Sequence, residues 1–202
     1  MQNTKSGDLN DRANELLEVL SLMFPVSPGF RVDFSKLPAT QYCRIKEVIL
    51  LPPAYARYAW YSVNVWLMAS LIDEQGADRV VRFYGPGQIF TDPLSFFKAK
   101  PSGLKLSALT PGLLLSMRRN GVVELKKYPE THELVTNILL LEQQTEAWRS
   151  RVMGLHDKDK LAAFAEAYPL HKIPSKYAAS FLNMGTANYC RERAAYNAEN
   201  RD

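Results

Sequence analysis

The hydrophobic period of the chain changes at Pro129, and this change constrains the fold more than any other feature of the sequence. Before it, between Tyr42 and Met117, apolar residues alternate with polar ones in short runs separated by turn residues. After it, seven residues follow at alternating intervals of four and three: Leu134, Ile138, Leu141, Thr145, Trp148, Val152 and Leu155. Alternation is typical of half-buried strands, and the four–three spacing is typical of a helix. The sequence therefore predicts an α+β protein whose strands precede a long helix.

Short strands and turn signals predict an antiparallel β-roll or sandwich in the first part of the chain. The run Tyr61–Leu67 alternates, Asp73–Gly76 reads as a hairpin turn into Arg79–Tyr84, and Gly85–Gly87 reads as a second turn. Strands at this spacing are typical of all-β units. Ahead of them, residues Leu9–Phe24 are predicted to form an amphipathic helix with these side chains on one side: Leu16, Leu17, Leu20 and Met23.

The helical run after Pro129 has two interpretations. The unbroken a/d spacing of its seven residues favours a seam between two chains, and therefore a homodimer. Leu139 and Leu140 broaden the apolar stripe, which is the pattern of a helix packed on its own domain. Gly154 and the charged run His156–Lys160 then predict a hinge, followed by a short helix.

The segment Ile173–Arg193 predicts two short helices around a tight turn. Pro174 suits the start of the first helix, Asn183-Met184-Gly185 supplies the turn, and Thr186 is the expected N-cap of the second. In a helix-turn-helix the second helix enters the major groove of DNA. The candidate DNA-binding residues are Lys172, Lys176, Thr186, Asn188, Arg191 and Arg193. The alternative is an ordinary helical hairpin, and Glu192, where a reader helix buries an aliphatic residue, favours that alternative.

Composition narrows the remaining function classes. The chain has 202 residues, 47% of them apolar and 23% charged, and a formal net charge of +4, which permits nucleic-acid binding without requiring it. Two distant cysteines, a polar start and no long apolar run predict a reduced, cytoplasmic protein that is not in a membrane. The sequence shows no metal-ligand spacing, and no P-loop or hydrolase motif that would indicate an enzyme. No cofactor is expected.

In this order of elements the chain resembles the Crp/Fnr family of bacterial transcription regulators. The resemblance rests on three stretches. The first begins with Gly87–Asp92 and ends with Ser107–Leu109, the second is Lys126–Glu130, and the third is the run AEAYPLHKIPSKYAASFLNM. The resemblance implies a cyclic-nucleotide-binding-like β-roll over residues 1–128, a dimerisation helix over 129–155 and a helix-turn-helix domain over 156–202. It further implies a homodimer on a near-palindromic operator, and a small-molecule effector of unknown identity inside the roll.

The chain departs from the family pattern at its expected ligand pocket, for which the candidate residues are Gly87, Thr91, Asp92, Ser102 and Gly103. The family's Gly-Glu pair is Thr91-Asp92 here, and its Arg-Ser or Arg-Thr pair is Ser102-Gly103. Ser102 cannot supply the charge that a cyclic phosphate needs. Val65 stands in place of a usual glycine, which predicts a regularised strand, and few residues follow Ala195, so no wing is expected. Two hypotheses remain: a DNA-binding regulator, or a ligand-sensing or protein-interaction module that has lost sequence-specific DNA binding.

Overall fold

The computed structural model describes residues 3–200, and the side chains of residues 10–200. Residues 1–2 and 201–202, the outer ends of the first and last predicted domains, lie outside the described residues. The chain begins with two helices, α1 (Asn3–Met23) and α2 (Pro28–Phe34). Leu16, Leu17 and Leu20 are buried on one side of α1, as their spacing predicts. The helix starts earlier than predicted. The prediction relied on an apolar stripe, and the polar residues ahead of Leu9 show none.

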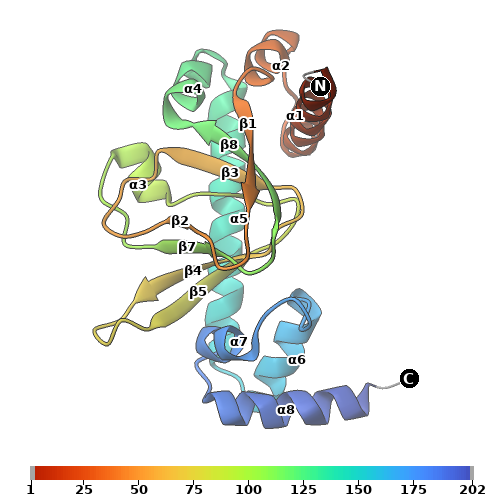
Figure 1. Cartoon of the computed structure of the whole chain (residues 1–202), viewed down its shortest axis with the longest axis vertical. Helices are drawn as coiled ribbons and strands as arrows, with labels where there is room; N and C mark the ends of the chain where they lie inside the picture. The colour runs from red at the N-terminus through yellow and green to blue at the C-terminus, as the bar shows by residue number, and fades with distance from the viewer. Residues whose placement is uncertain (1–2, 201–202) are drawn as a thin grey trace.

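Eight antiparallel strands form two four-stranded sheets, in the orders β1-β8-β3-β6 and β2-β7-β4-β5 (Figure 1). The prediction of an α+β fold with an antiparallel β-roll is confirmed. The strands are β1 (Pro38–Cys43), β2 (Val48–Leu50), β3 (Tyr58–Ser62), β4 (Leu67–Ile72), β5 (Asp78–Tyr84), β6 (Ile89–Phe90), β7 (Lys105–Ala108) and β8 (Gly112–Arg118).

The predicted continuous strand through Val65 is wrong, because the chain turns between β3 and β4. The Ser62 hydroxyl closes this turn: it accepts a hydrogen bond from the Val65 amide at 3.0 Å and donates to the Val65 carbonyl at 2.6 Å. The Val65 side chain is fully buried, so this turn holds a packed β-branched residue where the family usually has a glycine. The predicted hairpin turn is confirmed between β4 and β5, where Gly76 has a φ of +79°.

Three short helical segments and one long helix complete the roll. They are α3 (Pro93–Lys98) after β6, α4 (Arg119–Glu124) and η1 (Leu125–Lys127) after β8, and α5 (Glu130–Met153). In Figure 1, α5 runs the length of the roll from the level of α4 down to the last three helices. Those helices are α6 (Asp157–Ala167), α7 (Ser175–Phe181) and α8 (Thr186–Glu199). None of the helices in the described range is long and apolar enough to cross a membrane.

The predicted hinge is shorter in the structure. Only residues 154–156 separate α5 from α6, and the charged run from Asp157 to Lys160 is the first turn of α6. Asp157 and Asp159 lie in that first turn, where carboxylates favour a helix because they face the positive end of its dipole.

Two hydrophobic cores hold the chain together. The first fills the roll and includes the buried face of α1, together with Leu134 of α5. The second joins the roll to the last three helices and contains, among others, Phe83 of β5, Phe164 of α6 and Phe181 of α7. The backbone adds to this junction, because the Val80 amide donates to the Ser180 hydroxyl at 3.0 Å and that hydroxyl donates to the Asp78 carbonyl at 3.2 Å. The last helices are therefore docked on β5.

Candidate functional site

The helices α7 and α8 pack across the predicted tight turn. Asn183 adopts the left-handed conformation, with a φ of +52°, and the Met184 amide donates to the Ala179 carbonyl at 2.9 Å. Ala178 and Ala179 are buried, which allows the close crossing, and Tyr189 of α8 is fully buried against them in the same core. The predicted N-cap Thr186 is instead the first residue of α8, and the N-cap is Gly185, which makes no side-chain capping hydrogen bond.

The six candidate DNA-binding residues differ in how free their side chains are. Lys172, Lys176, Thr186 and Arg191 are exposed, and the Arg191 side chain is 75% accessible. Asn188 is half-buried, accepts a hydrogen bond from Arg191 and donates one to Asp157 of α6. Arg193 is half-buried and donates to the Ser175 hydroxyl of α7 at 3.1 Å. Arg191 is thus the exposed guanidinium of α8, whereas Arg193 contributes to the contact between α7 and α8.

Glu192 is neither fully exposed nor buried without a partner. Its side chain is 20% accessible, and its carboxylate pairs with Arg191 at 3.2 Å. The desolvation that a carboxylate at this position would otherwise suffer is therefore partly offset by its neighbour. The same pair places a negative charge beside the exposed arginine.

Two of the predicted ligand-pocket residues, Asp92 and Ser102, are brought together but bind each other. The Ser102 hydroxyl donates to the Asp92 carboxylate at 2.7 Å. The other oxygen of Asp92 accepts from the Ser95 amide at 3.1 Å and caps α3. Both side chains are buried. The carboxylate is therefore used to begin a helix and to hold the following loop.

The stretch from Gly87 to Leu109, called the cassette below, lacks the arginine of the family's pocket, and no described side chain replaces it. Lys98 and Lys100 are exposed, and Lys105 pairs with Asp78 at 2.9 Å. Gly103 is exposed, with nothing close to the position of a Cβ atom, and Gly87 lies in the turn between β5 and β6 with a φ of +83°. The cassette thus lacks a buried positive group for an anionic phosphate.

Cyclic AMP is expected to bind weakly or not at all. Its phosphate would lose water without gaining a positively charged partner, because Lys98 and Lys100 are exposed and the Ser102 hydroxyl already donates to Asp92. The measurement is a calorimetric titration of the folded protein with cyclic AMP, with circular dichroism as the control for folding. An isotherm with micromolar or tighter affinity would contradict the prediction.

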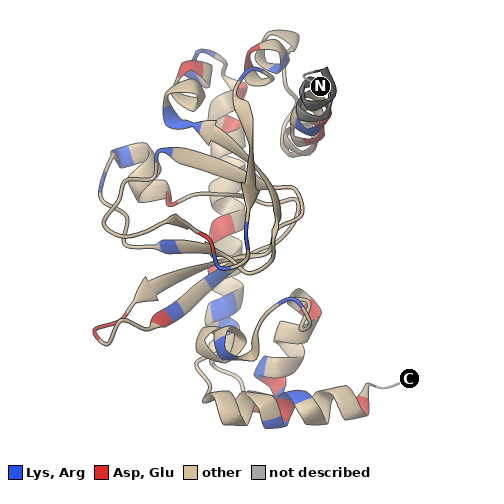
Figure 2. Cartoon of the chain, in the orientation of Figure 1, with Lys and Arg blue, Asp and Glu red and all other residues tan. Residues whose placement is uncertain are grey.

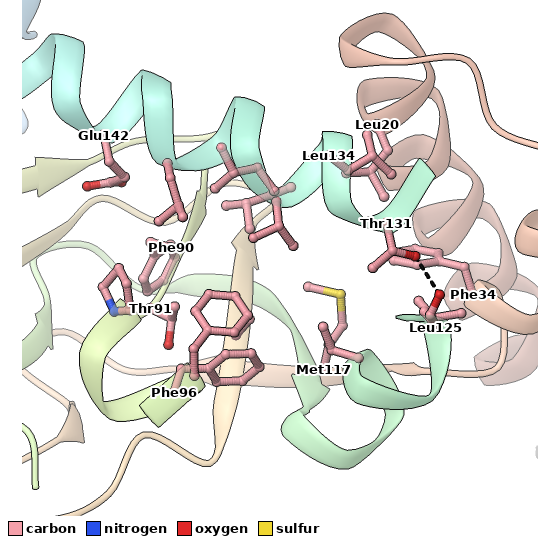
Figure 3. A pocket seen from close by; sticks show the side chains of 18 of the residues that line it. Leu20, Phe34, Phe90, Thr91, Phe96, Met117, Leu125, Thr131, Leu134 and Glu142 are labelled. Carbon is pink, nitrogen blue, oxygen red and sulfur yellow. Dashed lines mark hydrogen bonds between the residues drawn. The ribbon is translucent and has the colours of Figure 1, made fainter. Parts of the chain in front are cut away.

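An apolar pocket lies between the cassette and α5 (Figure 3). Its volume is about 90 Å³, and six of its lining residues are Phe34, Phe90, Phe96, Met117, Leu125 and Leu134. Ligand pockets for drug-sized molecules usually measure about 300–1,000 Å³. This pocket is therefore too small, as well as too apolar, for a nucleotide.

The polar side chains at the apolar pocket already have partners. The Thr131 hydroxyl donates to the Leu125 carbonyl at 2.6 Å, the dashed line in Figure 3, and the Thr91 hydroxyl donates to the Tyr58 carbonyl at 2.9 Å. Glu142 is held by Arg82 at 2.6 Å. An effector entering this space would find few free hydrogen-bonding groups, so it must be small and uncharged.

Arg82 of β5 connects the roll to α5 through a nearly buried ion pair that sequence reasoning missed. Its side chain is 6% accessible, and both terminal nitrogens donate to the Glu142 carbonyl at 3.1 Å. Glu146 accepts a further contact at 3.3 Å. Burial raises the pKa of Glu142, and the Arg82 guanidinium opposes that rise. No signal in the sequence pairs these residues, because sixty positions separate them and an arginine on an alternating strand normally points to water.

The structure divides the seven residues of the predicted dimer seam. Leu134 and Val152 are buried within the chain itself, and the Trp148 ring packs on Tyr168 with ring centres 5.8 Å apart. Leu141 and Leu155 are exposed, while Ile138 and Thr145 are half-buried. Leu139 and Leu140, which broadened the stripe, are exposed as well. The free apolar surface of α5 is therefore centred on residues 139–141, because Leu134, Trp148 and Val152 pack within the chain itself.

Among the described residues, no group of three or more histidine, cysteine or acidic side chains is arranged to hold a metal ion. Cys43 is buried, Cys190 is exposed, and both are free thiols. Burial raises the pKa of the Cys43 thiol to about 11.

A β-roll, a long helix and a terminal α7–α8 pair is the architecture expected from the family resemblance, and solved structures share it. No protein family and no curated protein matches the sequence. FixK2 from Bradyrhizobium japonicum has a TM-score of 0.71 at 12% identity, covering 81% of this chain and 86% of that one. A putative transcriptional regulator of the Crp/Fnr family from Eubacterium rectale has a TM-score of 0.69 at 12% identity, covering 88% of each chain.

A third structure is the c-di-GMP responsive global regulator CLP from Xanthomonas campestris. Its TM-score is 0.65 at 13% identity, and the match covers 86% of this chain and 93% of that one. Sequence identities this low support a shared fold, and no closer relationship. The chain therefore has the fold of the Crp/Fnr regulators.

Proposed function

We propose that the protein is a dimeric transcription regulator that binds DNA through α8. The observation that carries the proposal is the exposed Arg191 on a helix held across a tight turn by buried Tyr189. Arginine is the side chain best suited to bidentate contacts with guanine or phosphate. Exposed Lys172 and Lys176 would add affinity for the phosphate backbone that does not depend on sequence. Such a regulator acts in the cytoplasm, where Cys43 and Cys190 stay reduced.

The proposed dimer contact is the free apolar surface of α5. Leu139, Leu140 and Leu141 are consecutive residues of α5 and are each between 39% and 49% exposed. A second α5 packed there would remove these side chains from water, which stabilises association by roughly 25 cal/mol per Å² of apolar area. Two α8 helices could then occupy half-sites of a near-palindromic operator.

The proposed sensor is not a cyclic-nucleotide receptor. Asp92 and Ser102 bind each other, and the apolar pocket beside them lies against α5. A small uncharged effector there would contact both the cassette and the helix that leads to α6, and so could shift the position of α8.

Replacing Arg191 by alanine is expected to weaken DNA binding by on the order of 1–3 kcal/mol, or about 5- to 150-fold. DNA sequences bound by the purified protein are first selected from a random pool, and affinity is then measured by fluorescence anisotropy at stated salt concentrations. Arg44→Ala, which removes an exposed arginine from the turn after β1, is the matched control and should bind as tightly as the unaltered protein. Equal affinities for all three proteins would show that α8 is not the reader.

A second candidate function is a ligand-sensing or protein-interaction module without sequence-specific DNA binding. It is favoured by Glu192, whose carboxylate lies 3.2 Å from Arg191 and competes with DNA for that guanidinium. In that case the selection from a random pool would enrich no sequence, and any DNA binding would fall steeply with salt for all sequences alike.

A further inference from the structure

A basic hollow lies on the roll where β3 begins and β8 ends, and neither Asp92 nor Ser102 lines it. Its volume is about 510 Å³, and Arg57, Arg118 and Arg119 line it with Tyr55, Tyr58 and Asn120. The sheet brings these segments together: Tyr58 is the register partner of Arg118, and the Arg119 amide donates to the Arg57 carbonyl at 2.9 Å. Three arginines from two segments about sixty residues apart thus line one hollow.

Among the described residues, no acidic side chain lines the basic hollow. Within the described part of the chain, none of the three arginines takes part in an ion pair, and the Arg119 side chain donates only to the Phe97 carbonyl, at 3.5 Å. The buried Arg82 is different, because Glu142 and Glu146 match its charge. Exposed Lys98 follows Phe97 and adds to the positive charge. Figure 2 shows this excess as blue segments around α3, the start of β3 and the start of α4.

We propose that the basic hollow binds an organic polyphosphate that carries a planar ring. Planar guanidinium groups bind phosphate oxygens through paired charge-assisted hydrogen bonds, and a bound anion would relieve the repulsion among the three arginines. Tyr55 is half exposed and Tyr58 is half-buried, so their rings offer faces on which a planar group can stack.

The shape of the hollow favours a small molecule over an acidic protein segment. It is concave, and buried Ala56 and Ser95 form part of its wall. The Ser95 hydroxyl accepts a hydrogen bond from the Ala56 amide at 2.8 Å, which fixes the segment that carries Tyr55 and Arg57. A volume of about 510 Å³ lies within the usual range of small-molecule sites, about 300–1,000 Å³. This site is separate from α8 and from the apolar pocket, so it does not depend on the proposed function.

The test is a calorimetric titration of the full chain with ATP, pyrophosphate and adenosine. ATP is expected to bind more tightly than pyrophosphate, and adenosine is expected to bind weakest, because the charge and the ring both contribute. The double variant Arg57→Gln/Arg118→Gln should weaken ATP binding by about tenfold or more. The control Arg44→Gln/Arg79→Gln removes two exposed arginines that do not line the hollow, and it should leave the affinity unchanged.

A further control is Arg191→Ala, which removes the exposed guanidinium of α8 and should not change ATP binding. All variants change exposed side chains, and circular dichroism confirms their folding. An absence of ATP binding would overturn the proposal, as would a loss of binding in either control that equals the loss in the double variant. Pyrophosphate binding as tight as that of ATP would overturn the role of the ring. A glutamate-rich peptide that binds more tightly than ATP would overturn the assignment to a small molecule.

Discussion

Replacing Phe181 by alanine should lower the free energy of unfolding by about 3–5 kcal/mol, the range for phenylalanine in a packed core. Phe181 is fully buried, and its ring lies 5.1 Å from that of Phe83 and 5.7 Å from that of Phe164. The Arg149 guanidinium lies 5.0 Å from the same ring. Alanine would leave a cavity where the roll, α5 and α7 meet. Urea unfolding measures the change, and the melting temperature should fall by about 6–20 °C.

A double-mutant cycle locates this effect at the junction. Phe83→Ala changes the roll side of the same contact, and the two substitutions should be non-additive by about 0.5–3 kcal/mol. Leu94→Ala, at a side chain that is 65% exposed on α3, is the control and should change stability by less than about 0.5 kcal/mol. A zero coupling between Phe83 and Phe181 would mean that β5 and α7 do not share a core in solution.

Replacing Glu142 by alanine is expected to destabilise the protein by about 3 kcal/mol. Breaking a buried ion pair from one side costs roughly 3–5 kcal/mol, because the remaining charge loses its partner without regaining water. Glu142 is 27% accessible and Glu146 remains 3.3 Å from Arg82, so the lower end of that range applies. Glu133→Ala, on the same helix but exposed, should have little effect in the same urea measurement.

Removing both charges separates the cost of an unpaired arginine from the value of the pair. Arg82→Met/Glu142→Leu keeps the volume and leaves no buried charge, so the double variant should be more stable than Glu142→Ala. If the double variant were instead less stable than Glu142→Ala, the ion pair itself would hold α5 on the roll. In that case the ion pair between Arg82 and Glu142 would stabilise the fold by more free energy than the desolvation of the two charges costs.

The elements that could be predicted are those whose signal is local. The buried face of α1 follows from the spacing of Leu16, Leu17 and Leu20, and the β4–β5 hairpin from Asp73–Gly76. Asn183 marked the turn between α7 and α8, because few other residues tolerate a φ of +52°. The strand predicted through Val65 failed because a buried serine hydroxyl closed the turn, and alternation alone does not reveal such a bond.

The candidate site could be predicted only where one element presents it. Arg191 follows from the helical period of α8, and its exposure agrees with that period. Asp92 and Ser102 were identified by position, but their mutual hydrogen bond depends on how the loop after α3 folds back. The heptad spacing identified the apolar side of α5, yet Leu134 and Val152 lie within the chain's own cores. Spacing states which side chains share a face and not which partner covers that face.

The sequence by itself determined the order of the elements, because hydrophobic period and turn chemistry act between neighbouring residues. It also determined that the cassette has no arginine for a cyclic phosphate. Only the tertiary structure decided that Arg82 pairs with Glu142 and that Arg57, Arg118 and Arg119 line one hollow. These contacts join residues about sixty positions apart, so they depend on sheet register and on the docking of α5. Long-range pairing of this kind leaves no periodic trace in the chain.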